Sequence, residues 1–302
     1  MKPKVIVIVG PTASGKTALS IELAKKLNGE IISADSMQIY KKMSIGTAKP
    51  TLEEMQGITH HMIDIIEPNE DYNVAMYKKM AEDKIEEILS KGKQPIIAGG
   101  TGLYVDTLVN GIEFFDIEND FEYRTFLEKE TEKNGVDWLF EKLQNVDPEA
   151  AKSIEKNNVR RVIRALEIYK VTGKTKTQLD IESRKGSKYD YIILGMLWNR
   201  EELYERINLR VDIMLKNGLV EEVKSLLEND GFSKTALQGL GYKEVVQYLE
   251  NKIPYEEMIE KIKMETRRYA KRQMTWFNRN KNIIWLDAKN KNLVDEALNN
   301  IN

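Results

Sequence analysis

Short runs of apolar residues, rich in isoleucine and valine, recur towards both ends of the chain and predict buried strands. Continuous apolar runs without alternation are typical of strands covered on both faces, as in parallel sheets. The runs span residues 5–9, 30–34, 94–98, 189–197 and 283–287, with a weaker candidate at residues 61–66. Helical periodicity fills residues 18–27 and 74–91 between them. Alternating strands and helices predict an α/β fold with a parallel sheet and right-handed crossovers.

The strand pattern stops in the middle of the chain. Residues 113–188 contain no strong strand, and helical patterns occur there at residues 121–134, 136–145, 148–154 and 159–172. We therefore expect an all-helical insertion domain at 113–188. The α/β core domain would then consist of residues 1–112 and 189–302, with helical patterns in its C-terminal region.

A glycine-rich stretch directly follows the first predicted strand and opens the first predicted helix. Its sequence fits G-x-x-x-x-G-K-[ST], the phosphate-binding P-loop, and consists of Gly10, Pro11, Thr12, Ala13, Ser14, Gly15, Lys16 and Thr17. Strand, loop and helix together aim backbone N–H groups and a helix N-terminus at a phosphate. Lys16 adds a positive charge, and the Thr17 hydroxyl is a candidate Mg²⁺ ligand. The motif predicts a site for a phosphate chain with Mg²⁺, without specifying ATP.

Polar residues also follow two other predicted strands. Asp35 comes directly after residues 30–34, and Thr101 lies in a glycine-rich turn after residues 94–98. In open parallel sheets, ligands bind beyond the carboxyl ends of the strands. We therefore expect Asp35 to lie in the same crevice as the P-loop, and Thr101 offers a hydroxyl at another strand end.

Composition excludes several other kinds of site. The chain has 302 residues with a net charge of −2 and no cysteine, and its only two histidines, His60 and His61, are adjacent. The absence of cysteine excludes disulfides, thiolate zinc sites and a cysteine nucleophile, and it suits the reducing cytoplasm. No apolar stretch is long enough to predict a membrane span.

Basic residues are concentrated near the C-terminus despite the nearly neutral total charge. Residues 266–286 contain no acid and carry Arg267, Arg268, Lys271, Arg272, Arg279 and Lys281 among aromatic residues. Basic side chains beside aromatics suit a phosphate backbone with unstacked bases. Arg160, Arg161 and Arg164 form a second basic cluster, and Lys243 lies in a glycine-rich loop. These three elements predict a surface for single-stranded nucleic acid.

Motifs over nearly the whole chain resemble the bacterial type of tRNA dimethylallyltransferases. The matching segments are GPTASGKT at 10–17, SADSMQIY at 33–40, IGTAKP at 45–50, GGTGLY at 99–104, RRVIRALE at 160–167, GYKE at 241–244 and AKRQMTWF at 270–277. The P-loop is shared with many families, whereas the DSMQIY and KRQMTW segments are much more specific. Eukaryotic members append a zinc finger, which this cysteine-free chain lacks.

The resemblance implies a reaction and roles for particular residues. Dimethylallyl diphosphate would give its prenyl group to N6 of the adenosine at tRNA position 37, just 3′ of the anticodon, and diphosphate would leave. Asp35 would be the base near N6, Thr101 would lie where adenosine meets the donor, and Lys16 with Mg²⁺ would stabilise the leaving group. An arginine assists there in the family; Arg210 matches it, and Arg206, one helical turn away, is the fallback.

The same resemblance implies the partners and a set of tRNA-binding residues. The partners would be tRNA, through its anticodon stem-loop, and dimethylallyl diphosphate; the protein would be a cytoplasmic monomer that binds no membrane. The residues at the matching positions are Asp35, Ser36, Met37, Gln38, Thr101, Arg160, Arg161, Arg164, Gly241, Tyr242, Lys243, Arg268, Lys271, Arg272, Gln273, Thr275 and Trp276.

Other functions remain open at this stage. A P-loop kinase for a small metabolite would use Asp35 to activate a hydroxyl, but it would not need the basic tract. An adenylate isopentenyltransferase, which modifies free adenine nucleotides, would not need the basic tract either. A non-enzymatic RNA-binding NTPase switch would need a metal-binding aspartate at the end of a strong strand, and only Asp64 is a candidate.

Overall fold

The computed structural model describes residues 2–115 and 117–301 of the chain. They form two compact units. The first consists of Met1–Val109 and Ser187–Asn302, and the second of Asn110–Gly186. The divisions lie near the expected ones at 112/113 and 188/189, and each unit is described below by itself.

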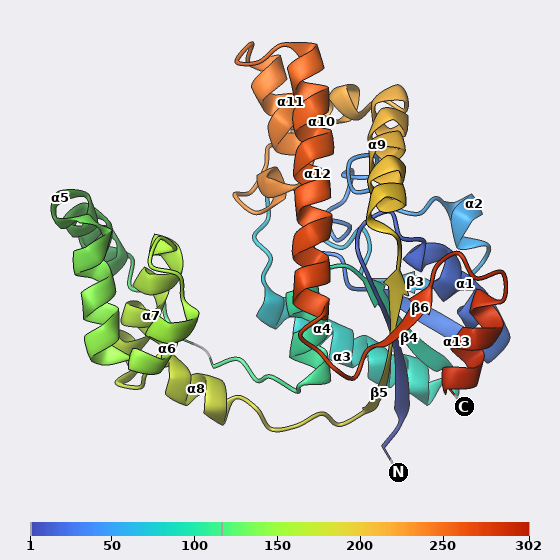
Figure 1. Ribbon diagram of the computed structural model, residues 1–302, viewed down its shortest axis with the longest axis horizontal. Coiled ribbons are helices and arrows are strands. Elements are labelled where there is room, and N and C mark those ends of the chain that lie inside the picture. The colour runs from blue at the N-terminus through green and yellow to red at the C-terminus, as the bar shows by residue number, and fades with distance from the viewer. Residues whose placement is uncertain (1, 116, 302) are drawn as a thin grey trace. The chain divides into compact units, whose positions relative to one another are not determined.

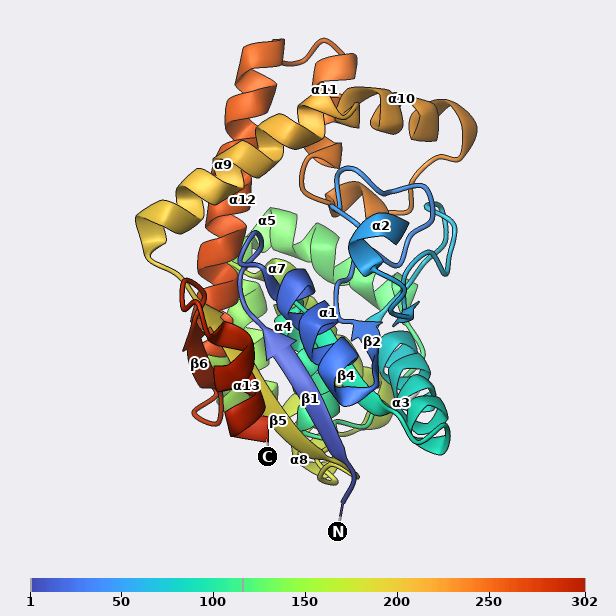
Figure 2. The same cartoon turned by 90° about the vertical axis from the view of Figure 1, so that its right-hand side faces the viewer.

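A six-stranded sheet with all strands parallel forms the centre of the first unit (Figure 2). Its order is β3-β2-β4-β1-β5-β6. The strands are β1 (Lys4–Val9), β2 (Gly29–Ser33), β3 (His60–His61), β4 (Gln94–Gly99), β5 (Asp190–Leu197) and β6 (Ile284–Asp287). Val9 is in register with both Gly99 and Gly195, so the loops after β1, β4 and β5 leave the sheet at the same edge.

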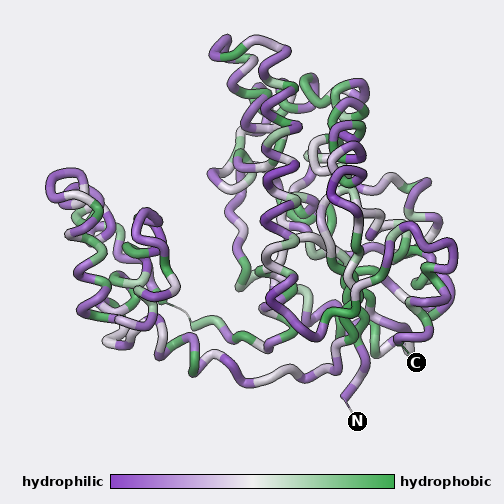
Figure 3. Tube along the Cα trace, viewed as in Figure 1, coloured by the Kyte–Doolittle hydropathy of each residue, from purple (hydrophilic) through white to green (hydrophobic). Residues whose placement is uncertain are grey.

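Helices cover both faces of the sheet, which explains the continuous apolar runs. Alternate residues of β1 face opposite sides: Val5, Val7 and Val9 pack in one core cluster, while Ile6 and Ile8 pack in another. The first cluster includes α3 (Val74–Ser90) and α4 (Gly102–Val109), and the second includes α1 (Lys16–Leu27) and α13 (Leu293–Ile301). Figure 3 shows hydrophobic residues both in the region of the sheet and on the helices around it. The predicted parallel α/β fold is therefore confirmed.

A further helical layer lies beyond the carboxyl edge of the sheet (Figures 1 and 2). It contains α9 (Arg200–Lys216), α10 (Leu219–Asn229), α11 (Tyr242–Leu249) and the long α12 (Tyr255–Phe277), with the short η1 (Ala236–Gln238) and α2 (Leu52–Met55) nearby. α12 packs against α9, α11 and α4. Because α12 reaches from the outer helices to the sheet edge, it brings C-terminal residues to the loops after the strands.

The second unit contains only helices among its described residues, apart from an isolated bridge between Ile112 and Arg184. The helices are α5 (Phe121–Val146), α6 (Pro148–Ser153), α7 (Val159–Thr172) and α8 (Lys176–Glu182). α5 joins two predicted helices across a kink at Gly135, whose φ of 83° suits glycine. Leu127, Leu139 and Val162 lie in its own core, as expected of a helical insertion.

The predicted strand at residues 61–66 is wrong over most of its length. Only His60 and His61 pair with β2, because Met62 and Asp64 adopt φ values of 63° and 55° that break an extended chain. Ile66 forms a single bridge with Tyr40. Asp64 is ion-paired with Lys49, so it does not support the NTPase-switch alternative.

A buried carboxylate at the start of β2 links three elements. Glu30 accepts hydrogen bonds at 2.7 Å from both His61 Nε2 and Lys93 Nζ, and Lys91 lies at 3.5 Å. Burial alone would raise the pKa of Glu30, but these partners outweigh it and hold the pKa at about 2. A carboxyl with a lowered pKa stabilises the fold above its unfolded pKa of 4.5, and this contribution disappears as the pH falls through about 2.

We expect Glu30→Gln to remove this pH-dependent contribution. The lost stability should be about 3 kcal/mol near neutral pH, since each pKa unit corresponds to about 1.4 kcal/mol. Urea unfolding of both proteins from pH 7 to pH 2 measures it. The difference between them should shrink steadily below pH 4.5; a difference that is the same at every pH would contradict the assignment.

No helix among residues 2–115 and 117–301 is both long and apolar enough to cross a lipid bilayer.

Candidate active site

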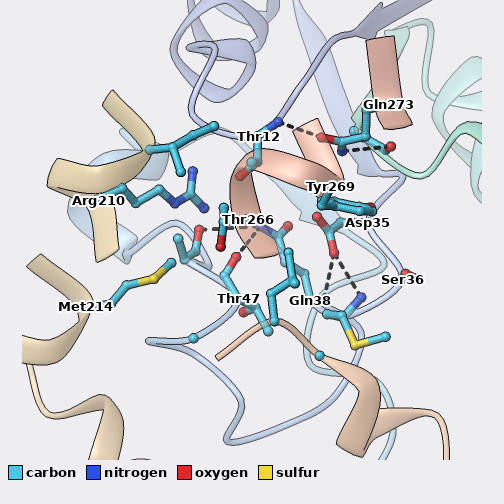
Figure 4. A pocket seen from close by; sticks show the side chains of 18 of the residues that line it. Thr12, Asp35, Ser36, Gln38, Thr47, Arg210, Met214, Thr266, Tyr269 and Gln273 are labelled. Atoms are coloured by element: carbon cyan, nitrogen blue, oxygen red, sulfur yellow. Dashed lines mark hydrogen bonds between the residues drawn. The ribbon is translucent and has the colours of Figure 1, made fainter. Parts of the chain in front are cut away.

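A cavity of about 350 Å³ lies where the loops after β1, β2 and β4 meet α9 and α12 (Figure 4). Every residue that lines it belongs to the first unit. From the predicted set it brings together Thr12, Lys16, Thr17, Asp35, Ser36, Met37, Gln38, Arg210, Tyr242, Arg272 and Gln273. The prediction that the P-loop and Asp35 share a crevice is confirmed, because parallel strands end at a common edge.

The P-loop keeps its shape through contacts made on its outer side. Gly15 has a φ of 89° and Ala13 one of 61°, so the loop is tightly curled. Arg206 Nε donates to Ala13 O and Trp198 Nε1 donates to Ser14 O, both at 2.9 Å. These bonds tie two carbonyl groups of the loop to β5–α9 side chains and so fix the loop from outside the cavity.

Two cations stand together in the cavity. Lys16 Nζ donates to Pro11 O at 2.6 Å, and Lys16 and Arg210 repel each other electrostatically. Burial and then the charge of Arg210 lower the pKa of Lys16 to about 7, while Asp35 acts in the opposite direction. Burial likewise lowers the pKa of Arg210. A doubly negative group bound between these cations would raise the pKa of both Lys16 and Arg210, because it supplies the missing counter-charge.

The geometry separates the two candidate arginines. Arg210 lines the cavity, whereas Arg206 stacks over Trp198, 4.4 Å from the ring centroid, and holds the outside of the P-loop. Both lie on α9, one turn apart, so only the docking of that helix decides which guanidinium faces inward.

Asp35 lies opposite the cations, at the end of β2. Its Oδ1 accepts from the backbone N–H of Met37 at 2.9 Å and of Gln38 at 3.4 Å, so the side chain is oriented by its own loop. Thr101 Oγ1 accepts from Ser36 N at 3.0 Å and donates to Ser36 Oγ at 3.3 Å. Thr101 is not among the cavity-lining residues, but it holds the loop that carries Asp35.

Several residues expected at the tRNA surface make bonds inside the protein. Gln273 is buried and bonded at both ends of its amide; Trp276 Nε1 donates to Asp106 at 2.8 Å; and the fully buried Tyr242 donates to Glu222 at 2.6 Å. Gln38 Oε1 accepts from Ser33 Oγ, and Gly241 N donates to Glu244. These contacts give each of the five an internal structural role in the first unit.

The basic tract has an exposed face on α12. Arg268, Lys271, Arg272 and Thr275 are exposed, as is Lys243 at the start of α11, and Arg272 also lines the cavity. Arg268 forms an ion pair with Glu265, just before the acid-free stretch. Arg160, Arg161 and Arg164 belong to the second unit, on α7, where Arg164 pairs with the buried Glu167.

An apolar wall and one loop were not predicted as parts of the site. Ile207, Val211 and Met214 from α9 line the cavity, as do Ile262 from α12 and the segment 46–48. Glu222 holds this segment by accepting from the N–H groups of Ser44, Ile45 and Gly46. No local signal distinguishes helix residues that face a cavity from those that face a core, because both are apolar at helical spacing.

A metal site made only of side chains is absent from the described residues, since no cluster of three His, Cys, Asp or Glu occurs in ranges 2–115 and 117–301. The exposed Thr17 at the start of α1 does line the cavity, with Asp35 also on its wall. One hydroxyl suits Mg²⁺ that is held mainly by phosphate oxygens and water, as is common for this ion.

Comparisons with known proteins give consistent results. The family model described as IPP transferase matches residues 38–280. A tRNA dimethylallyltransferase of Caldanaerobacter subterraneus is 52% identical over 306 residues, covering 100% of this chain and 97% of its own. One from Acetivibrio thermocellus is 51% identical over 300 residues, covering 98% and 96%.

Solved structures agree with the sequence relatives. A tRNA isopentenylpyrophosphate transferase from Bacillus halodurans is similar with a TM-score of 0.75 at 43% identity, covering 99% of this chain and 97% of its own. A eukaryotic dimethylallyltransferase acting on tRNA gives a TM-score of 0.84 at 35% identity, covering 98% of this chain and 78% of its own. The family model matches most of the chain, and two relatives are more than 50% identical to it over nearly its whole length. The chain therefore belongs to the IPP transferase family.

Proposed function

We propose that the protein transfers a dimethylallyl group from dimethylallyl diphosphate to N6 of adenosine 37 in tRNA. One observation carries this proposal: a single cavity combines a P-loop, the two cations Lys16 and Arg210, the carboxylate of Asp35 and apolar side chains of α9. The membership in the family and the names of its relatives support the reaction.

Each part of the cavity suits one part of the donor or acceptor. The diphosphate would lie in the P-loop between Lys16 and Arg210, with its C5 chain against Val211 and Met214. The adenine N6 would approach from the side of Asp35. This order places the reacting carbon between nucleophile and leaving group, as a displacement requires.

The residues supply the proton and charge changes of the reaction. N6 attacks the first carbon of the prenyl group, the carbon–oxygen bond breaks with its electron pair going to diphosphate, and Asp35 accepts the N6 proton. The P-loop amides, Lys16 and Arg210 stabilise the charge that develops on the diphosphate. Mg²⁺, held by Thr17 and the diphosphate, would supply additional charge stabilisation when bound.

The acceptor has to leave the base stack to reach this cavity. Extruding a nucleotide costs a few kcal/mol and is easier in a loop than in a duplex, which suits the anticodon loop. We propose that the protein acts as a monomer, in the cytoplasm where tRNA is found.

The direct test incubates purified protein with unmodified tRNA, Mg²⁺ and either dimethylallyl diphosphate or ATP. We expect N6-isopentenyladenosine in nuclease digests, detected by mass spectrometry, and diphosphate release that needs no ATP. A tRNA whose position 37 is not adenosine is the matched control. Phosphate transfer from ATP with no prenylated adenosine would instead identify a small-metabolite kinase, and prenylation of free adenosine monophosphate but not tRNA an adenylate isopentenyltransferase.

The exposed face of α12 provides a separate prediction about tRNA. Changing Arg268 and Lys271 together to Ala should weaken tRNA binding and leave donor binding unchanged, because neither residue lines the cavity, whereas Arg272, the third basic residue of this face, does. The slope of log affinity against log salt should flatten by roughly 0.7–0.9 for each phosphate contact that is lost. Filter binding between 50 and 300 mM salt measures this slope. An unchanged slope with lower thermal stability would show that these residues only stabilise the helix.

A further inference from the structure

The side chain of Gln273 joins two loops that leave different strands of the sheet. Its Oε1 accepts from the backbone N–H of Thr12 at 2.9 Å, and its Nε2 donates to the carbonyl of Gly100 at 3.0 Å. Gln273 lies on α12 and is 6% exposed (Figure 4). A primary amide can accept and donate at once, so glutamine suits this pair of partners.

The two loops belong to opposite ends of the proposed reaction. Thr12 is in the P-loop, which would hold the donor. Gly100 precedes Thr101, whose hydroxyl bonds to Ser36 beside Asp35, on the acceptor side. Since β1 and β4 are neighbours in the sheet, one amide from a distant helix can reach both loops. A continuous path of hydrogen bonds and one peptide linkage therefore connects the P-loop to the loop that carries Asp35.

Gly100 is adapted to this contact. A Cβ on Gly100 would lie 2.2 Å from Gln273 Nε2, closer than real contacts allow. The backbone of Gly100 is not in the left-handed region, so this glycine is not required by its φ angle. The absence of a side chain at this position therefore serves the close approach of Gln273.

The Thr12 N–H that binds Gln273 is unavailable to a phosphate. This hydrogen bond therefore fixes the position of the P-loop and does not contribute to binding the charged phosphates of the donor. The low exposure of Gln273 also makes it a poor candidate for the direct tRNA contact expected from its motif.

We propose that Gln273 is a positioning residue that sets the spacing between the donor loop and the acceptor side of the cavity. This inference rests on the proposed prenyl transfer. Displacement of reacting groups by about 1 Å can slow a reaction about 10²-fold, so loss of the link should reduce the rate of transfer more than the affinity for either substrate.

The first test measures single-turnover transfer in Gln273→Ala with donor and tRNA both saturating. We expect the rate to fall about 10- to 100-fold, while the tRNA dissociation constant and the donor KM stay within about threefold. Gln247→Ala, the same substitution on α11 and outside the cavity, is the matched control and should retain the rate. Circular dichroism and thermal unfolding check that both variants fold.

The second test uses Gly100→Ala in two backgrounds. In the unchanged protein its methyl group should displace the Gln273 amide and reduce the rate about as much as Gln273→Ala does. In the Gln273→Ala background the clash is gone, so Gly100→Ala should cause little further loss. Such non-additivity identifies two changes that act on one interaction.

The outcomes separate this inference from the proposed function. If the unchanged protein forms no prenylated adenosine, the proposed function fails. If it does, but Gln273→Ala keeps its rate at saturation and loses only tRNA affinity, Gln273 is a tRNA contact. A loss of thermal stability with an unchanged rate, or fully additive losses with Gly100→Ala, would also overturn the positioning role.

Discussion

Asp35→Asn should slow prenyl transfer by about 10²- to 10⁴-fold, the usual contribution of a general base. The asparagine amide keeps the shape of the side chain, and its oxygen can still accept from the backbone of Met37 and Gln38. It has no basic oxygen that could take the N6 proton. Single-turnover assays with both substrates saturating measure the loss, and equilibrium binding should show donor and tRNA affinities within a few-fold of the unchanged protein.

A matched control uses an aspartate that does not line the cavity. Asp83→Asn changes an exposed aspartate on α3, outside the cavity, and should leave the rate unchanged. A rate for Asp35→Asn within a few-fold of the unchanged protein would show that N6 loses its proton to another acceptor, and Asp35 would then be only part of the loop structure.

Lys16→Met should reduce transfer by about 10²- to 10³-fold, because it removes one charge that stabilises the leaving diphosphate. Methionine retains much of the length and apolar character of the lysine side chain, so the P-loop should keep its fold. The measurement is the rate at saturating donor, with thermal unfolding as the check on folding. A large increase in donor KM with an unchanged rate would mean that Lys16 binds the donor equally in ground and transition states.

The lowered pKa of Lys16 also predicts that donor binding depends on pH. Without donor, Lys16 has a pKa of about 7, because burial and then the charge of Arg210 lower it, while Asp35 acts in the opposite direction. A bound diphosphate favours the charged form and raises the pKa, so binding above pH 7 takes up a proton. The donor dissociation constant should therefore rise from pH 7 to 9, by at most about tenfold per pH unit.

Calorimetry in two buffers of different ionisation enthalpy measures this proton directly. At pH 8.5 we expect uptake of about one proton per donor in the unchanged protein, following the pKa of about 7. Lys16→Met should lack this uptake. Equal uptake in both proteins would assign the proton to another group.

Local patterns were sufficient for the sheet and the P-loop. The strand runs at residues 5–9 and 94–98 are apolar because helices bury both of their faces, so burial is encoded within each short segment. The glycine spacing at 10–17 is likewise local, since it reflects the backbone of one loop. The failure at residues 61–66 has a local cause that sequence pattern does not reveal, namely the left-handed φ angles of Met62 and Asp64.

The basic tract shows what such patterns leave open. The tract combines basic, polar and aromatic residues in one segment of sequence, and α12 divides them between two faces. Arg272 and Lys271 are exposed, while Gln273 and Trp276 point inward and bond to Gly100 and Asp106. Motif membership did not separate these roles, because both faces carry polar or aromatic side chains.

The sequence by itself determined the fold class, the phosphate loop, the place of Asp35 at a strand end and the resemblance to a family, because each depends on residues close together in the chain. Only the tertiary structure decided that Arg210 and not Arg206 faces the cavity, that an apolar wall comes from α9, and that Gln273 joins two loops. These features depend on the direction in which α9 and α12 dock onto the sheet edge. That direction follows from packing between helices and from contacts between distant parts of the chain, such as the hydrogen bond between Thr12 and Gln273, which are 261 positions apart.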